Sequence, residues 1–207
     1  MKFSILAGLT FIQLLASPLA IAKLPEHVQL LLDQRRCVRC DLSRANFSQA
    51  DLRSVNLRGS NLIYANLSGA DLSAANMIGV KLQEARLNGS NLEASRMNIV
   101  DLTKADLSGA NLNGADLRSA RATEANLRGA TLDGAQLRGA NFSRATLASI
   151  AAQNSDLFAA NLSEADLRNA NLRGADLENA NLTNADLRGA DLTGANLKGA
   201  IMTGVRQ

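Results

Sequence analysis

The chain has 207 residues, of which 46% are hydrophobic and only 3% aromatic, with no Trp, one His and two Cys. The hydrophobic fraction excludes a disordered chain, and the scarcity of aromatics predicts a core built from small and medium aliphatic side chains. A single His excludes multi-His metal sites and most His-dependent catalysis. The formal net charge is only +3, which argues against a dedicated nucleic-acid-binding protein.

Residues 1–22 have the pattern of a secretory signal peptide. Lys2 gives a positive start, Phe3–Leu15 is an apolar run, and Ala20-Ile21-Ala22 forms a small-x-small cleavage site before Lys23. The apolar run is too short to span a bilayer comfortably. We therefore expect an exported protein with no membrane association after cleavage; an uncleaved N-terminal anchor is the alternative.

The segment after the signal, residues 23–39, is predicted to cap the domain that begins at residue 40. Within Leu24–Arg36, Pro25 stands at a helix-start position, and Val28, Leu31 and Leu32 have the i, i+3, i+4 spacing of one helix face. This predicts a short amphipathic helix that covers the end of that domain.

Cys37 and Cys40 form a Cys-x-x-Cys motif where this segment ends. An exported protein meets an oxidising compartment, which favours a local disulfide between the two. Two reduced thiols, or a redox-sensitive module, are the alternatives. Asp41 follows the second Cys, so the motif is not a haem-attachment site, and the chain lacks the further ligands that zinc needs. No cofactor or metal is expected.

From Cys40 onward the sequence repeats every five residues, without insertion, through residue 204. The central position of each unit begins at Leu42 and is Leu in 26 of 33 units, and every exception is apolar. Two residues earlier the position is Ala in 24 units, and Asp or Asn usually stands between these two. Apolar residues at alternate positions have the period of a short extended segment.

The remaining two residues of each unit must turn the chain, because three extended residues alone cannot continue as a strand. Every glycine except Gly8 lies two residues after the central position, where a type II turn needs a positive φ. A period of five keeps no stripe on one face of a helix, so an α-helical repeat is excluded.

Runs such as Ala165–Asn169 and Ala175–Asn179 match the A(D/N)LxX consensus, and the chain resembles the pentapeptide-repeat proteins. The resemblance covers residues 40–204 and implies an all-β fold, a right-handed quadrilateral parallel β-helix of about eight coils. Four consecutive units would form one square coil, so that every fourth unit stacks on the same side. Residues 205–207 are then a C-terminal tail.

Two surfaces stand out as interaction candidates. The position after the central one is expected to be exposed, and its residues from every fourth unit would stack at one corner. At one such corner arginines lie between apolar side chains, and Arg and aromatic residues are enriched in protein interfaces. This corner stripe comprises Ile78, Ile99, Arg118, Arg138 and Phe158. The last units carry an apolar set, which suggests homodimerisation through the C-terminal coil: Ile201, Met202 and Val205.

These features predict a non-enzymatic, exported, rod-like scaffold or protein-interaction module with an unidentified protein partner. The recurrent Asp residues follow the repeat, so no carboxylate pair stands out as acid and base. Part of the family mimics DNA to bind topoisomerases, but such members are strongly acidic and cytoplasmic, unlike this chain. The resemblance to exported cyanobacterial members implies a periplasmic or extracellular location, or the thylakoid lumen.

Overall fold

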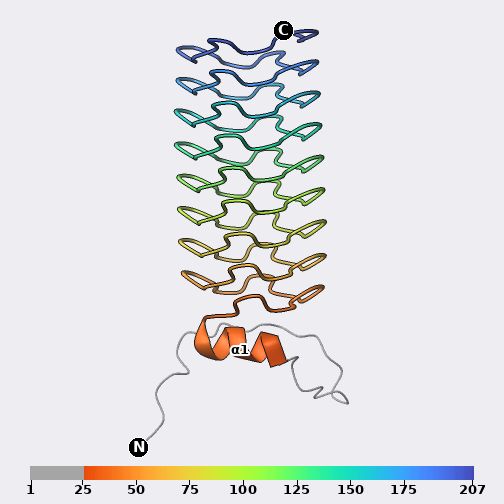
Figure 1. The fold of residues 1–207 in the computed structure, drawn as a ribbon, viewed down its shortest axis with the longest axis vertical. Coiled ribbons are helices and arrows are strands. Elements are labelled where there is room, and N and C mark those ends of the chain that lie inside the picture. Colours follow the sequence, from red (N-terminus) through yellow and green to blue (C-terminus); the bar gives the residue numbers. More distant parts are fainter. Residues whose placement is uncertain (1–25) are drawn as a thin grey trace, which may run out of the picture.

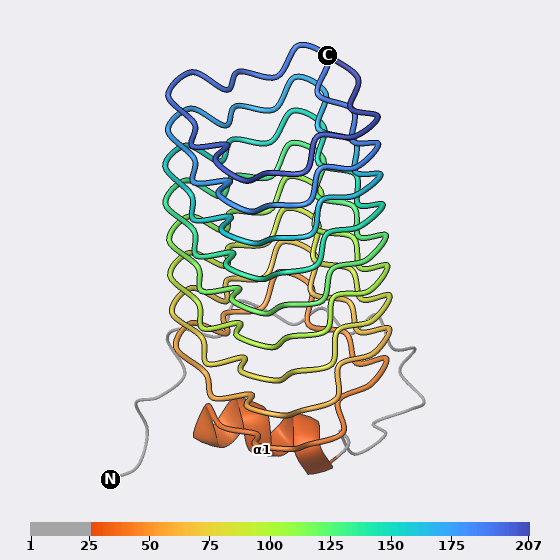
Figure 2. The same ribbon diagram turned by 45° about the horizontal axis from the view of Figure 1, so that its top comes forward.

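The computed structural model describes residues 26–207, which form one short helix followed by a stack of similar coils (Figure 1). The helix α1 spans Glu26–Gln34. In the tilted view the coils enclose a common axis and lie in register above one another (Figure 2). Parallel bridges join residues 20 positions apart, from the pair Arg36↔Asn56 to the pair Asp186↔Arg206. The predicted coil of four five-residue units is therefore confirmed.

The two apolar positions of each unit point into the stack. Ala110 and Leu112 have no exposed surface, and the same is true of most of their equivalents. The residue between them, Asn111, faces outward and forms the bridges to the neighbouring coils. Its side chain also accepts a hydrogen bond from the N–H of Asn113, at 3.1 Å. This local bond, typical of Asx turns, explains why Asp or Asn recurs at this position.

The turns have the predicted geometry. The N–H of Ala45 donates to the carbonyl of Leu42 at 3.1 Å, and equivalent bonds recur through the last unit. Every fifth residue from Arg39 to Gly204 has a positive φ, and many of these residues are not glycine. A left-handed conformation costs a non-glycine residue roughly 1–2 kcal/mol. It persists because the same N–H bonds to the next coil, as from Arg44 to the carbonyl of Ile63 at 2.9 Å.

The coil geometry extends beyond the predicted domain boundaries at both ends. Arg36 already bridges to Asn56, so the regular stack begins before residue 40. At the other end Arg206, within the predicted tail, bridges to Asp186. Among residues 26–207 the sides of the coils form single bridges and no longer strand.

Helix α1 packs against the first coil. Val28 and Leu31 are buried and belong to the same hydrophobic core as the coils, and Leu30 and Leu32 contact that core from the rim. Arg35, with a φ of 50°, ends the helix and turns the chain into the stack. No helix in residues 26–207 combines the length and the apolar character needed to cross a membrane.

Replacing Leu112 with Asp is predicted to lower the free energy of unfolding by more than about 4 kcal/mol, because it buries an unpaired charge in the dry interior. Urea denaturation followed by far-UV circular dichroism measures this loss. The exposed Arg128 lies in the same stack, and its replacement with Ala should change the value by less than about 0.5 kcal/mol. An unchanged Leu112→Asp protein would contradict the enclosed core.

Candidate functional site

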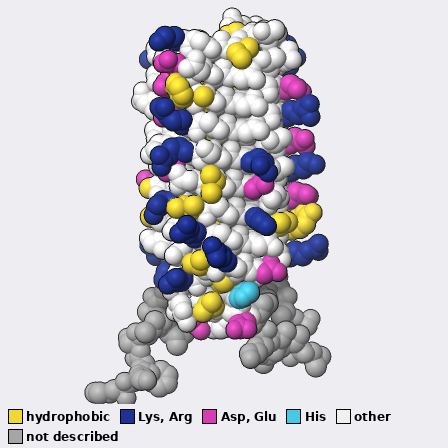
Figure 3. Space-filling view, viewed as in Figure 1, with side chains coloured by type: hydrophobic (Ala, Val, Ile, Leu, Met, Phe, Trp, Pro, Cys, Tyr) yellow, Lys and Arg dark blue, Asp and Glu magenta, His cyan; other side chains and the backbone are white. Residues whose placement is uncertain are grey.

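The corner stripe lies along one edge of the rod. Because each coil contains four units, Ile78, Arg118, Arg138 and Phe158 occupy the same turn position in successive or alternate coils. Ile99 belongs to the coil between Ile78 and Arg118, one residue further round the same turn. Basic and hydrophobic side chains gather along the left edge of the space-filling view (Figure 3). The structure divides the stripe into two parts with different chemistry.

The part nearer the C-terminus is a set of paired side chains. The guanidinium carbon of Arg138 lies 4.4 Å from the ring centroid of Phe158, within cation–π range. The Nε of Arg138 also donates to Asp156 at 3.1 Å. Arg138 thus binds an aromatic face and a carboxylate from the next coil at once. This arrangement fixes the long side chain against the surface of the rod.

Arg118 is neutralised within its own unit. Its Nε and a terminal nitrogen donate to the two oxygens of Asp116 at 2.8 and 2.6 Å. These hydrogen bonds are the main cause that lowers the pKa of the Asp116 carboxyl below its usual value. Exposed ion pairs of this kind contribute only about 0–1 kcal/mol to stability. A partner's carboxylate could therefore replace Asp116 or Asp156 at little cost to the fold.

The part nearer the N-terminus is an open groove of about 340 Å³. Two predicted residues, Ile78 and Ile99, line it, and Ile99 is 62% exposed. The other lining residues were missed by the sequence analysis: Val38, Arg39, Arg58, Gly59 and Gly79. Val38 and Arg39 fell outside the predicted repeat. Extending the five-residue pattern back by one unit would have placed them at this corner.

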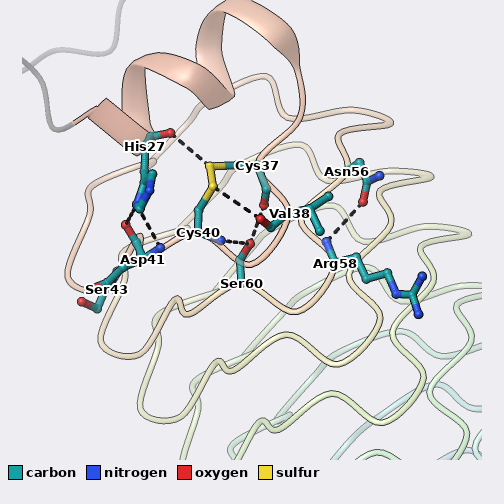
Figure 4. Close-up of a disulfide and its surroundings, with 9 residues drawn as sticks. All are labelled: His27, Cys37, Val38, Cys40, Asp41, Ser43, Asn56, Arg58 and Ser60. Atoms are coloured by element: carbon teal, nitrogen blue, oxygen red, sulfur yellow. Dashed lines mark hydrogen bonds between the residues drawn. A yellow bond between two sulfur atoms is a disulfide. The ribbon is translucent and has the colours of Figure 1, made fainter.

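A disulfide closes the turn that carries Val38 and Arg39. The structure joins Cys37 and Cys40, whose Cα atoms are 5.5 Å apart (Figure 4). In the other turns of residues 36–207, the N–H of the last turn residue donates to the carbonyl of the first, and this is the one turn that lacks that bond. The buried Ser60 hydroxyl replaces that bond, because it accepts from the N–H of Cys40 at 3.1 Å and donates to the carbonyl of Cys37. Ser60 therefore has a structural reason to stand where Ala is usual.

The same region ties α1 to the first coil. Nδ1 of His27 lies 3.1 Å from both the amide nitrogen and the carbonyl oxygen of Asp41, and the carbonyl oxygen of His27 lies 3.3 Å from Sγ of Cys37 (Figure 4). The chain's one histidine thus hydrogen-bonds to the backbone of Asp41, as an acceptor or as a donor according to its tautomer. Both sulfurs belong to residues that are almost completely buried, Cys37 and Cys40.

A different corner carries charges that pair with one another from coil to coil. The right edge of the space-filling view alternates acidic and basic side chains (Figure 3). Lys104 pairs with Glu124 at 3.7 Å, and Arg144 pairs with Glu164 at 3.0 Å. Each partner lies four units further along the chain and therefore directly on the next coil. This ladder leaves little unneutralised charge for a ligand.

The C-terminal candidates do not form one continuous surface. Met202 and Val205 occupy inward positions and pack, partly exposed, against the end of the core. Ile201 lies in the outward position between two inward ones and is 49% exposed on the side of the rod. The half-buried Leu192 and Leu197 join Met202 and Val205 at the end of the stack.

The comparisons with known proteins agree with this architecture. The model of pentapeptide repeats (8 copies) matches residues 40–79, 75–114, 110–148, 135–174 and 160–199. The cyanobacterial protein HetL from Nostoc sp. strain PCC 7120, a pentapeptide repeat protein involved in heterocyst differentiation regulation, is 34% identical. The alignment covers 83% of this chain and 84% of HetL, with a TM-score of 0.39.

QnrB1, a plasmid-mediated fluoroquinolone resistance protein, is 22% identical over 82% of this chain and 90% of its own, with a TM-score of 0.65. That likeness shows the fold alone. No curated protein matches the sequence. Together these findings imply a right-handed quadrilateral β-helix for the stacked coils.

Replacing Ser60 with Ala is predicted to cost about 1–3 kcal/mol, because the N–H of Cys40 and the carbonyl of Cys37 lose their buried partner. Ser90 is a matched control. Its hydroxyl donates to the Leu87 carbonyl, which also accepts the N–H of Ser90 and so stays bonded in the Ala variant. Urea denaturation should show a larger loss of unfolding free energy for Ser60→Ala than for Ser90→Ala. Equal losses would contradict the role given to Ser60.

Proposed function

The chain belongs to the pentapeptide-repeat family, and we propose that it is a non-enzymatic, exported scaffold that binds a protein partner through the corner stripe. The observation that carries this proposal is the placement of exposed basic side chains beside apolar ones along one corner. Of these apolar residues, Ile99 is exposed and Ile78 and Phe158 are half-buried. Arg and aromatic residues in contact, as in Arg138 and Phe158, are typical of protein-binding surfaces.

The interior supports a scaffold in preference to an enzyme. The central Leu residues and the Ala residues beside them fill the axis of the stack. The recurrent Asp and Asn residues accept the N–H of their own turns, as Asp41 does from Ser43 at 3.0 Å. Their carboxylates are thus explained by the fold and need no catalytic role.

Charge argues against a DNA-mimicking role. A mimic must present dense negative charge in place of phosphates, whereas this chain has a formal net charge of +3. Several of its carboxylates are bound by arginines of the same chain, as Asp116 is by Arg118. The likeness to QnrB1 does not extend to function at 22% identity.

Export is supported by the pattern of residues 1–22, which lie outside the described residues, and by the disulfide. The periplasm, the extracellular space or a thylakoid lumen would keep Cys37 and Cys40 oxidised. Burial of both residues favours a structural disulfide over a redox-sensitive module, because an attacking thiolate needs access to a sulfur.

The purified protein, used as bait on the envelope fraction of its own organism, is predicted to retain a protein partner. Arg118→Glu/Arg138→Glu should reduce the retained partner at least about tenfold, a loss typical of removing interface arginines. Arg144→Glu/Lys104→Glu, on the self-paired corner, is the matched control and should retain it.

The native protein in the same envelope fraction is predicted to begin at Lys23, because the signal peptide would have been removed. Intact mass spectrometry measures this.

Equal retention by both double variants would eliminate the corner stripe as the binding surface. A native protein that begins at Met1 and is recovered from the cytosol would contradict export. Circular dichroism of each variant ensures that a lost partner reflects lost contacts and not an unfolded rod.

We also infer self-association through the C-terminal coil, from Met202 and Val205, which are partly exposed at the end of the core. Sedimentation velocity is expected to give a dimer for the purified protein, and Met202→Glu/Val205→Glu is expected to give a monomer, because a charge at these positions opposes apolar burial. A monomer for the unmodified protein at the highest concentration reached would contradict this inference.

A further inference from the structure

We propose that the groove between Val38 and Ile99 binds an acidic peptide segment that inserts one aliphatic or aromatic side chain. The proposal rests on the interaction function proposed above and names its partner's chemistry. It concerns the groove residues already defined, which lie in the first coils beside α1. The apolar lining of the groove and its unneutralised arginines each contribute to the proposal.

Apart from its two arginines, the groove has an apolar lining. Val38, Ile78 and Ile99 are its aliphatic residues, and Gly59 and Gly79 also line it. A Cβ added to Gly59 would lie 3.3 Å from Cγ of Arg39, and one added to Gly79 would lie 3.7 Å from Cδ1 of Ile99. The stem of Arg39 and the side chain of Ile99 thus reach over the glycines. The space of about 340 Å³ admits a large apolar side chain from outside.

The rim of the groove carries positive charge that nothing in the described chain neutralises. Arg39 and Arg58 line the groove, and Arg36 and Arg96 lie on the same side of the rod. None of the four pairs with a carboxylate among residues 26–207, and residues 1–25 contain no Asp or Glu. All four side chains are exposed.

The contrast with the rest of the same side of the rod is sharp. No acidic residue occurs in the segments that build it over the first coils: 36–39, 56–59, 76–79 and 96–99. The first carboxylate on this side is Asp116, and from there on the arginines are paired. The groove is therefore the part of the corner whose charge is available to a ligand, and that charge is complementary to carboxylates.

A peptide fits these features better than a nucleic acid or a membrane. The groove has no aromatic side chain on which a base could stack. The apolar and basic residues line a concavity of about 340 Å³, which suits an inserted side chain better than a flat bilayer surface. Guanidinium groups bind planar carboxylates in bidentate geometry, which gives Asp and Glu beside the inserted residue a direct role.

The wall formed by Val38 and Arg39 is held in place before a ligand arrives. These two residues are the middle of the turn that the Cys37–Cys40 disulfide closes and that Ser60 of the next coil supports through hydrogen bonds. A constrained wall loses little conformational freedom on binding, which strengthens binding for a given set of contacts.

Selection of a phage-displayed random dodecapeptide library on the purified protein tests the proposal. Enriched peptides are expected to carry Asp or Glu beside Leu, Ile or Phe. Fluorescence anisotropy of a labelled, enriched peptide should show a Kd at least about tenfold weaker for Arg39→Glu/Arg58→Glu and at least about threefold weaker for Ile99→Ser. Arg128→Glu removes an exposed arginine, not among the ion pairs, from another corner and should leave Kd within about twofold.

The proposal is overturned if no peptide is enriched, if the enriched peptides lack acidic residues, or if Arg128→Glu weakens binding as much as Arg39→Glu/Arg58→Glu. It is also overturned if an oligothymidylate or anionic phosphatidylserine vesicles bind these arginines more tightly than the peptides do. Far-UV circular dichroism and thermal melts establish that each variant remains folded.

This experiment separates the groove from the wider proposed function. If the peptides fail but an envelope partner is still retained through Arg118 and Arg138, the groove proposal falls and the scaffold function stands. If the peptides bind as expected but no envelope partner is retained, the groove proposal stands and the proposed role of Arg118 and Arg138 in binding an envelope partner falls.

Discussion

The fixed offset between coils is the constraint on which the rest of the structure depends. The N–H of Leu112 donates to the carbonyl of Thr131 at 2.7 Å, and the N–H of Asn111 donates to the carbonyl of Ser90 at 2.9 Å. Such bonds repeat at almost every unit, so each position of the five-residue pattern stacks on the same position four units further along the chain. Burial of the Leu and Ala columns stabilises this register. Each surface side chain therefore lies in a column with the side chains at the same position in the coils before and after it.

Most of the fold could be predicted from the sequence because the five-residue pattern repeats without interruption and each of its positions has one physical role. The start of the stack could not, since Arg36-Cys37-Val38-Arg39 contains none of the Leu, Ala or Gly that mark the pattern. Its central position is filled by Cys37, and its turn is held by a disulfide and by Ser60 from the next coil. The contact between Cys37 and Ser60 crosses from one coil to the next, and a five-residue window does not contain it.

The candidate site was predictable as a set of columns but not as a distribution of charge. Arg118 and Arg138 fall in one column by counting, yet Arg118 pairs with Asp116 in its own unit and Arg138 with Asp156 in the next coil. Which carboxylate a long side chain reaches depends on its rotamer and on its neighbours, such as the ring of Phe158. The arginines of the groove look equivalent in sequence but lack such partners. The division of the corner stripe into a paired part and an open groove could therefore not be predicted from the sequence.

The position of the groove follows from the way in which the first coil is closed. A stack of coils leaves unpaired backbone and core at its ends, and here α1 covers the first coil with Val28 and Leu31. The chain turns from helix to coil at Arg35, and the disulfide-closed turn is the first turn of the stack. It places Val38 and Arg39 at the corner, where the stem of Arg39 lies close to Gly59 of the next coil. The first turn after the helical cap therefore supplies one side of the groove, and the disulfide constrains it.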